Sequence, residues 1–238
     1  MVLEKIKKLI PAYAVFPLMS VVLVNFTVYS GVSRLADSWK HYDLTTSFDR
    51  AVPLLPSFVS IYLLCFVFWV VNYIMIARQG KEHCMRFVVA EMMAKLICCV
   101  FFLVLPTTNV RPELAGSGIW NVVLQGVYDI DAATNLFPSI HCLVSWFCYI
   151  GLRGQKRVPK GYRVFSCVFA ILVCVSTQVT KQHYIVDVFG GIAIAELTYY
   201  IAFHTSGYKV LEKAYDKLYK KVFCREKVPA GKRVGFDK

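Results

Sequence analysis

Charge is missing from long stretches of this chain. Of its 238 residues, 18% are charged and 57% are hydrophobic, and the hydrophobic residues come in long blocks that are nearly free of charge. About 20 consecutive apolar residues cross a bilayer core, and several blocks approach that length. We therefore expect a polytopic membrane protein rather than soluble domains. Because backbone groups within lipid must bond to one another, each block is predicted to be a helix, which gives an all-α fold.

The patterns of metal sites and disulfide frameworks are also missing. The nine cysteines are odd in number, form no CxxC or Cys/His spacing, and lie mostly inside apolar blocks, where cysteine behaves as a small hydrophobic residue. No cluster of carboxylates suits a metal ion. We therefore predict no metal and no other cofactor. No cleavage site of a signal peptide is recognisable, so the first apolar block is expected to remain as an anchor.

The apolar blocks predict six transmembrane helices. They cover residues 10–29, 57–77, 87–105, 138–152, 164–179 and 183–204. Between the third and the fourth helix, a long loop contains a mildly amphipathic stretch at 119–128, which we expect at the membrane interface. Residues 1–204 thus form one membrane domain, and residues 205–238 form a basic tail with a predicted membrane-surface helix.

The net charge of +12 is unevenly distributed between the two sides of these helices. Of 27 Lys and Arg residues, 21 lie in the N-terminal segment, in the loops after the second and fourth helices and in the tail, whereas 5 lie in the other loops. Positive segments stay in the cytoplasm, so both termini are predicted to be cytoplasmic. This topology accounts for the basic charge without a nucleic-acid partner. We expect a multi-pass protein of the cell membrane.

Two polar residues stand at the start of the last apolar block. His183 and Asp187 are four residues apart, and on a helix this spacing places both side chains on one face. A carboxylate one turn from an imidazole can hold one ring nitrogen and leave the other free to react. The alternative interpretation is a polar pair that caps a helix.

Other polar residues are predicted to reach the same, external side of the membrane. Arg111 is the single basic residue of the long third loop, Ser139 and His141 open the fourth helix, and Lys181 precedes the last helix. Helix starts present free amides and a partial positive charge, so two cations beside two helix starts predict an anion site. Two histidines in such a site could divide the duties of nucleophile and acid.

With these residues in view, the chain resembles the type 2 phosphatidic acid phosphatase superfamily. That family carries, in this order, the motifs K-x-x-x-x-x-x-R-P, P-S-G-H and S-R-x-x-x-x-x-H-x-x-x-D. The order and the six-helix layout agree with this chain. The matching residues are Arg111 and Pro112, then Pro138, Ser139 and His141, then Ser176, His183 and Asp187.

The motifs are not complete. The chain has Val104 in place of Lys, Ile140 in place of Gly and Thr177 in place of Arg. Lys181 is predicted to serve in place of the missing Arg. The stretches N-L-F-P-S-I-H at 135–141 and H-Y-I-V-D-V at 183–188 are similar to the branch that holds sphingomyelin synthases and inositol phosphorylceramide synthases, which move a phosphorylated headgroup between lipids.

The resemblance implies a mechanism without a metal. His183 would attack phosphorus and form a phosphohistidine, and Asp187 would orient its ring. His141 would protonate the leaving oxygen and then activate water or an acceptor alcohol. The residues expected to hold the phosphoryl oxygens are Arg111, Lys181 and Ser139.

The function implied is hydrolysis of a phosphate ester or pyrophosphate of a lipid at the outer membrane face, with a lipid phosphate substrate and the membrane as partners. A lipid phosphotransferase and a catalytically inactive relative remain alternatives. A transporter or channel would need polar residues through several helices, whereas here they gather at one depth. Glu91 and Lys95, four residues apart in the third helix, are interpreted as a structural ion pair, with a functional relay as the alternative.

Overall fold

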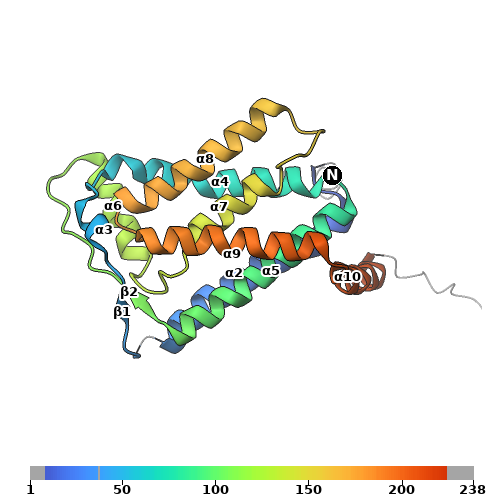
Figure 1. Cartoon of the computed structure of the whole chain (residues 1–238), viewed down its shortest axis with the longest axis horizontal. Coiled ribbons are helices and arrows are strands. Elements are labelled where there is room, and N and C mark those ends of the chain that lie inside the picture. Colours follow the sequence, from blue (N-terminus) through green and yellow to red (C-terminus); the bar gives the residue numbers. More distant parts are fainter. Residues whose placement is uncertain (1–8, 37, 224–238) are drawn as a thin grey trace, which may run out of the picture.

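The computed structural model describes residues 9–36 and 38–223, and helices make up most of this part of the chain (Figure 1). The predicted N-terminal segment 1–9 falls almost entirely outside these residues, as do residues 224–238 of the tail. The long helices are α2 (Val15–Ala36), α4 (Val59–Ala77), α5 (Lys81–Val104), α8 (Lys160–Val179) and α9 (Ile185–His204). The shorter elements are η1 (Ala12–Ala14), α3 (Ser47–Ala51), η2 (Pro56–Phe58), α6 (Ile119–Ile130), α7 (Ile140–Ile150) and α10 (Tyr208–Phe223).

Five helices of the described chain are long and apolar enough to cross a membrane. They are Ala12–Ala36, Pro56–Ala77, Lys81–Val104, Lys160–Val179 and Ile185–His204. The protein is therefore an all-α, multi-pass membrane protein. The remaining predicted span, α7, has 11 residues, which rise about 16 Å at 1.5 Å per residue. That is about half of a bilayer core.

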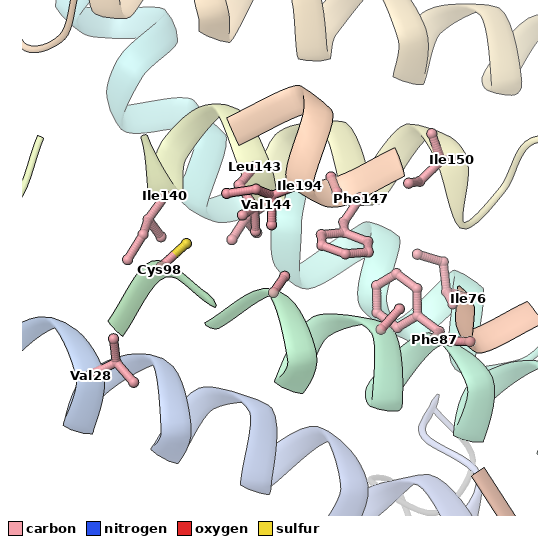
Figure 2. Packing of buried hydrophobic residues seen from close by; sticks show 14 of the residues in the cluster. Val28, Ile76, Phe87, Cys98, Ile140, Leu143, Val144, Phe147, Ile150 and Ile194 are labelled. Carbon is pink, nitrogen blue, oxygen red and sulfur yellow. The ribbon is translucent and has the colours of Figure 1, made fainter. Parts of the chain in front are cut away.

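The short helix α7 lies at the centre of the fold, packed against α4, α8 and α9. Its sequence has little charge, so it can be buried on most sides, and the side chains of Leu143, Phe147 and Ile150 are fully buried. Figure 2 shows these residues together with their neighbours from the surrounding helices. The labelled neighbours are Val28 of α2, Ile76 of α4, Phe87 and Cys98 of α5, and Ile194 of α9.

The outward faces of the long helices carry large apolar side chains. Phe26 on α2 is 66% exposed, and Phe189 on α9 is 65% exposed. Val70 on α4, Val100 on α5 and Val168 on α8 are exposed as well. Such a belt around the whole bundle is expected where lipid, rather than water, covers the helices.

Several helix boundaries differ from the prediction. The third predicted helix starts at Lys81 instead of residue 87, because Gly80, with φ 128°, starts the helix there and Lys81 forms ion pairs with Glu212 (3.1 Å) and Asp216 (2.8 Å) of α10. The last helix starts at Ile185 instead of 183, after the N-cap residue Tyr184. The sequence periodicity predicted neither the ion pairs of Lys81 with α10 nor the N-cap at Tyr184.

Two other predictions concern local structure. The amphipathic stretch 119–128 is helical, as α6, and lies at the same end of the molecule as the start of α9 (Figure 1). Glu91 and Lys95 form the predicted ion pair, with 3.5 Å between Nζ and Oε2, and both side chains are buried. The hydroxyl of Tyr73 also donates to Glu91, so the pair is part of the packed interior.

A short parallel pairing holds the loops at the end where α9 begins. Strand β1 (Tyr42–Asp43) pairs with β2 (Thr107–Thr108), and Thr108 also bridges to Thr134. The pairing joins the loop after α2 to the loop after α5. It therefore fixes the segment that carries Arg111 next to the segment that leads into α7.

Candidate active site

His183 is held in a turn just before α9. Its N–H donates to the carbonyl of Thr177 at 3.1 Å, and its own carbonyl accepts from Nε2 of Gln178 at 2.8 Å. The Nδ1 atom of its ring lies 3.1 Å from the carbonyl oxygen of Leu136. Because a carbonyl oxygen can only accept, Nδ1 carries the hydrogen, and Nε2 keeps the lone pair that a nucleophile needs.

Asp187 lies in the first turn of α9 and contacts the same ring nitrogen. Its Oδ2 is 3.4 Å from Nδ1 of His183 and accepts the N–H of Tyr184 at 2.8 Å. The carboxylate therefore caps the helix and also contacts the imidazole. These contacts are compatible with both interpretations of the pair, the helix cap and the reactive His–Asp pair. The premise that both residues sit on one helix face is wrong, because His183 precedes the helix. The bend at Tyr184 nevertheless brings them together.

The environment of His183 raises its pKa. Burial alone lowers the pKa of the ring, but the hydrogen bond and the negative charge of Asp187 outweigh burial, and the pKa ends above the ordinary value of 6.5. A positive ring is therefore stabilised here, as is needed when the imidazole carries a transferred group.

The start of α7 is fixed against the start of α9. Ser139, the N-cap of α7, donates its N–H to the carbonyl of Asp187 at 3.1 Å, and its hydroxyl accepts the N–H of Cys142 at 3.3 Å. Gly191 permits this approach, since a Cβ there would come 2.6 Å from the carbonyl oxygen of Ser139. The close packing places His141, two residues after Ser139, beside His183.

The two histidine rings lie close together, with their planes tilted by 54°. Their centroids are 5.8 Å apart. Aromatic residues of α4 surround His141, with ring centroids at 4.5 Å for Tyr62, 6.0 Å for Phe66 and 5.5 Å for Trp69. The hydroxyl of Tyr62 lies 3.5 Å from Nδ1 of His141.

Arg111 enters the site from the long loop. One guanidinium nitrogen donates to the carbonyls of Tyr128 (3.0 Å) and Asp131 (2.5 Å), and the other donates to Oε1 of Gln182 at 2.6 Å. The guanidinium also lies over the ring of Tyr128, 4.6 Å from its centroid. Nε of Arg111 and Nε2 of Gln182 are buried and have no hydrogen-bond partner among the described residues.

Arg111, Gln182, His141 and His183 line one cavity of about 430 Å³. Another part of its wall comes from α2 and α4 and is mostly apolar or aromatic. Among these wall residues, Phe26 is 66% exposed, Leu63 is 41% exposed and Phe66 is 48% exposed on the outside of the bundle. The cavity therefore lies between a polar end and a wall that faces lipid.

The structure does not bring all predicted residues to this cavity. Lys181 has left-handed backbone (φ 55°), and its ammonium donates to the carbonyls of Asp49 (2.8 Å) and Val52 (2.5 Å), away from the cavity lining. Val104, at the position of the family's Lys, is 76% exposed at the end of α5. Thr177, at the position of the family's Arg, is fully buried and supports the turn of His183.

Three residues at the site were missed by the sequence analysis. Gln182 offered a signal, since it stands next to His183 and aims a polar side chain at Arg111. Asp131 and Tyr62 offered none, because a loop acid and a helix tyrosine are ordinary at their positions. Asn135, in the loop before α7, has φ 54° and donates from its side-chain amide to the hydroxyl of Ser33 at 2.7 Å.

A comparison with protein families decides the family. The PAP2 superfamily matches residues 34–201, which is more than half of the chain and includes every residue of the cavity that follows α2. The chain belongs to the PAP2 superfamily. Neither the curated proteins nor the solved structures gave a match. Membership in the PAP2 superfamily indicates a phosphatase or phosphotransferase type of activity on a phosphate ester.

Proposed function

We propose that this protein is a membrane enzyme that hydrolyses a phosphate ester or pyrophosphate of a lipid through a phosphohistidine on His183. The observation that carries the proposal is the shared cavity. His183 and His141, 5.8 Å apart, stand at its polar end beside Arg111, and its apolar wall reaches the outside of the bundle. A soluble phosphate ester would not require that wall.

In the first step, the lone pair on Nε2 of His183 attacks phosphorus. The P–N bond forms while the bond from phosphorus to the leaving oxygen breaks. His141, as an imidazolium, gives its Nε2 proton to that oxygen, so that an alcohol leaves rather than an alkoxide. Asp187 contacts Nδ1 of His183 at 3.4 Å and stabilises the positive ring that results.

In the second step, His141 is neutral and takes a proton from water through Nε2. The oxygen of that water attacks phosphorus, the P–N bond breaks, and its electron pair returns to Nε2 of His183. Inorganic phosphate leaves, and His141 is an imidazolium again. The two steps return both histidines to their starting states.

The phosphoryl oxygens need hydrogen-bond donors near both histidines. Arg111 and Gln182 provide buried N–H groups at the cavity. Ser139 opens α7, whose first-turn amides at Ile140 and His141 have no partner within the helix. We assign Ser139 to positioning these amides. Lys181 was predicted as a phosphate ligand, and its two carbonyl partners favour a role in fixing the turn before Gln182.

The membrane layout belongs to the same proposal. We place α7 as a sixth, short span enclosed by the five long helices, with both termini cytoplasmic and the cavity at the external face of the cell membrane. The charge distribution supports this orientation, since basic residues concentrate at the opposite side. Residues 1–204 then form the catalytic membrane domain and residues 205–238 the cytoplasmic tail.

A second candidate is transfer of a phosphorylated headgroup to another lipid, as in the sphingomyelin synthase and inositol phosphorylceramide synthase branch. One observation favours it. The side-chain oxygens of Asn25 and Asn135, both cavity residues, are buried and have no hydrogen-bond partner in residues 9–36 and 38–223. Such acceptors fit the hydroxyl of an acceptor lipid, which would replace water in the second step.

The test is phosphate release by the purified protein in detergent from phosphatidate and isoprenoid pyrophosphates. We expect release by the wild type and by His204→Ala, which changes an exposed histidine at the other end of α9, and none above background by His183→Ala. Full turnover by a folded His183→Ala variant would contradict the proposal. Release from no lipid phosphate, with headgroup transfer between two lipids, would identify the second candidate.

A further inference from the structure

Asp131 is a carboxylate in the cavity wall with no role in the mechanism above. It follows α6, and its carbonyl accepts a hydrogen bond from Arg111 at 2.5 Å. Its side chain accepts from two hydroxyls, those of Tyr29 on α2 and of Tyr62 on α4, the latter at 3.0 Å from Oδ2. Two helices and a loop thus converge on one carboxylate, which fixes its position beside His141.

Tyr62 connects this carboxylate to His141. Its hydroxyl lies 3.0 Å from Oδ2 of Asp131 and 3.5 Å from Nδ1 of His141, and its ring lies 4.5 Å from the imidazole, tilted by 31°. The side chain of Tyr62 is 3% exposed, so it is held in place. The 3.5 Å contact is long, as hydrogen bonds of catalytic groups often are before substrate binds.

The single hydroxyl hydrogen of Tyr62 determines the tautomer of His141. An ionised carboxylate can only accept, and it is a stronger acceptor than a neutral ring nitrogen, so Asp131 takes this hydrogen. The phenol oxygen then presents a lone pair to Nδ1, which must carry the hydrogen to bond with it. Nε2 of His141 is left for proton transfer at the cavity.

We propose that Asp131 is a positioning residue that acts through Tyr62, keeping the hydrogen of His141 on Nδ1 and stabilising its imidazolium. The inference rests on the proposed function, because that reaction uses His141 as acid and base. In the first step Nε2 gives a proton to the leaving oxygen, and in the second it takes one from water. Nδ1–H stays bonded to Tyr62 in both steps, so Asp131 supports His141 as Asp187 supports His183.

The kinetic test compares two leaving groups with Asp131→Asn and Tyr62→Phe. Tyr29→Phe is the matched control, since it removes the other hydroxyl from Asp131 and leaves the contact between Tyr62 and His141. A lipid monophosphate releases an alkoxide and needs an acid, whereas p-nitrophenyl phosphate releases a stable phenolate. General acid catalysis contributes about 10²- to 10⁴-fold. We expect kcat/KM for the lipid to fall by roughly 10- to 100-fold in both test variants.

The same variants should keep kcat/KM for p-nitrophenyl phosphate within about threefold, because kcat/KM reports the phosphoryl transfer to His183 and this leaving group needs no proton. Tyr29→Phe loosens Asp131 but keeps the contact between Tyr62 and His141, so it should lose less kcat/KM on the lipid than Tyr62→Phe and should keep kcat/KM for p-nitrophenyl phosphate within the same range. Equal losses of kcat/KM on both substrates would mean that Asp131 and Tyr62 only support the fold of the site, and would overturn the proposal. A loss in Tyr29→Phe as large as in Tyr62→Phe, or no loss in Tyr62→Phe, would overturn it as well.

A second measurement does not depend on turnover. At a pH high enough to leave His141 neutral, nitrogen-15 chemical shifts of labelled histidines in detergent report its tautomer, and the His141 signal can be assigned from its loss in His141→Gln. We expect the Nδ1–H form in the wild type and in Tyr29→Phe, and a mixed or Nε2–H form in Tyr62→Phe. The Nε2–H form in the wild type would overturn the proposal. The Nδ1–H form in a protein that releases phosphate from neither substrate would leave this contact intact and instead contradict the proposed function.

Discussion

Gly191 on α9 lies directly against the backbone of Ser139 at the start of α7. A Cβ on Gly191 would come 2.6 Å from the carbonyl oxygen of Ser139 and 3.2 Å from the amide nitrogen of Leu143. Backbone atoms cannot move aside as a side chain can, so any larger residue must push the two helix starts apart. The distance between His141 and His183 therefore depends on a glycine.

Gly191→Ala should reduce activity more than its single methyl group suggests. We expect kcat/KM to fall by roughly 100-fold, since a displacement of about 1 Å between reacting groups can cost that much. Gly161→Ala on α8 is the control, because a Cβ there meets no atom of the described part of the chain within 4 Å. Steady-state kinetics and the Tm of both variants in detergent give the comparison. Wild-type activity in Gly191→Ala would show that the close approach is not needed.

The pH dependence should follow the protonation of His183. Asp187 raises the pKa of this histidine above 6.5 against the opposing effect of burial. Only the neutral ring attacks phosphorus, so kcat/KM should rise with pH through this raised pKa, with its acidic limb above pH 6.5. In Asp187→Asn the charge is lost and burial remains, so the limb should move to lower pH.

The same variant should also be slower, by roughly 100-fold, because the imidazolium of His183 loses its counter-charge. Asp129→Asn, at an exposed carboxylate of α6, is the matched control and should leave both the limb and the rate unchanged. A pH profile measured for the three proteins on one substrate is sufficient. An acidic limb that stays in place in Asp187→Asn would contradict the pairing of Asp187 with His183.

Lys181 should behave as a structural residue. Its ammonium bonds two partly buried backbone carbonyls, those of Asp49 and Val52, and leaving these acceptors without a donor costs up to about 1–3 kcal/mol each. We expect Lys181→Met to lower the Tm by several degrees while KM for the lipid phosphate changes by less than about threefold. A large rise in KM with an unchanged Tm would instead make Lys181 a phosphate ligand, as the sequence predicted.

The orientation in the membrane can be tested by cysteine labelling. Val110 is 85% exposed beside Arg111, and Lys213 is exposed on α10 at the other end of the molecule (Figure 1). In a background without native cysteines, Val110→Cys should react with an impermeant maleimide added to intact cells. Lys213→Cys should react only after the cells are permeabilised. The reverse pattern would place the cavity on the cytoplasmic side.

Apolar blocks and motif residues carried most of what the sequence predicted. Long runs without charge predicted the five long helices and a further helix where α7 lies, because backbone satisfaction in lipid leaves helices as the available structure. Arg111, His141 and His183 were singled out because they gather at one predicted membrane depth beside two helix starts, and the cavity brings them together. The roles assigned to these residues stay predictions.

What the sequence did not predict depends on contacts between distant segments. His183 was placed on α9, but the extended N-cap conformation of Tyr184 and the carbonyl of Leu136 hold it before the helix. Lys181 was taken for a free cation, and the carbonyls that occupy it come from residues about 130 positions earlier. Asp131 and Tyr62 meet only in three dimensions, so no local pattern could link them.

The most direct test of the central claim is to trap the phosphorylated enzyme. The wild type and His183→Gln are mixed with a labelled lipid phosphate, quenched in alkali within one turnover, and mapped by peptide mass spectrometry. We expect the wild type to carry one phosphoryl group on His183, which is lost in acid, and His183→Gln to carry none. A phosphoryl group on another residue, or wild-type turnover without any phosphorylated enzyme, would contradict the assignment of His183 as the nucleophile.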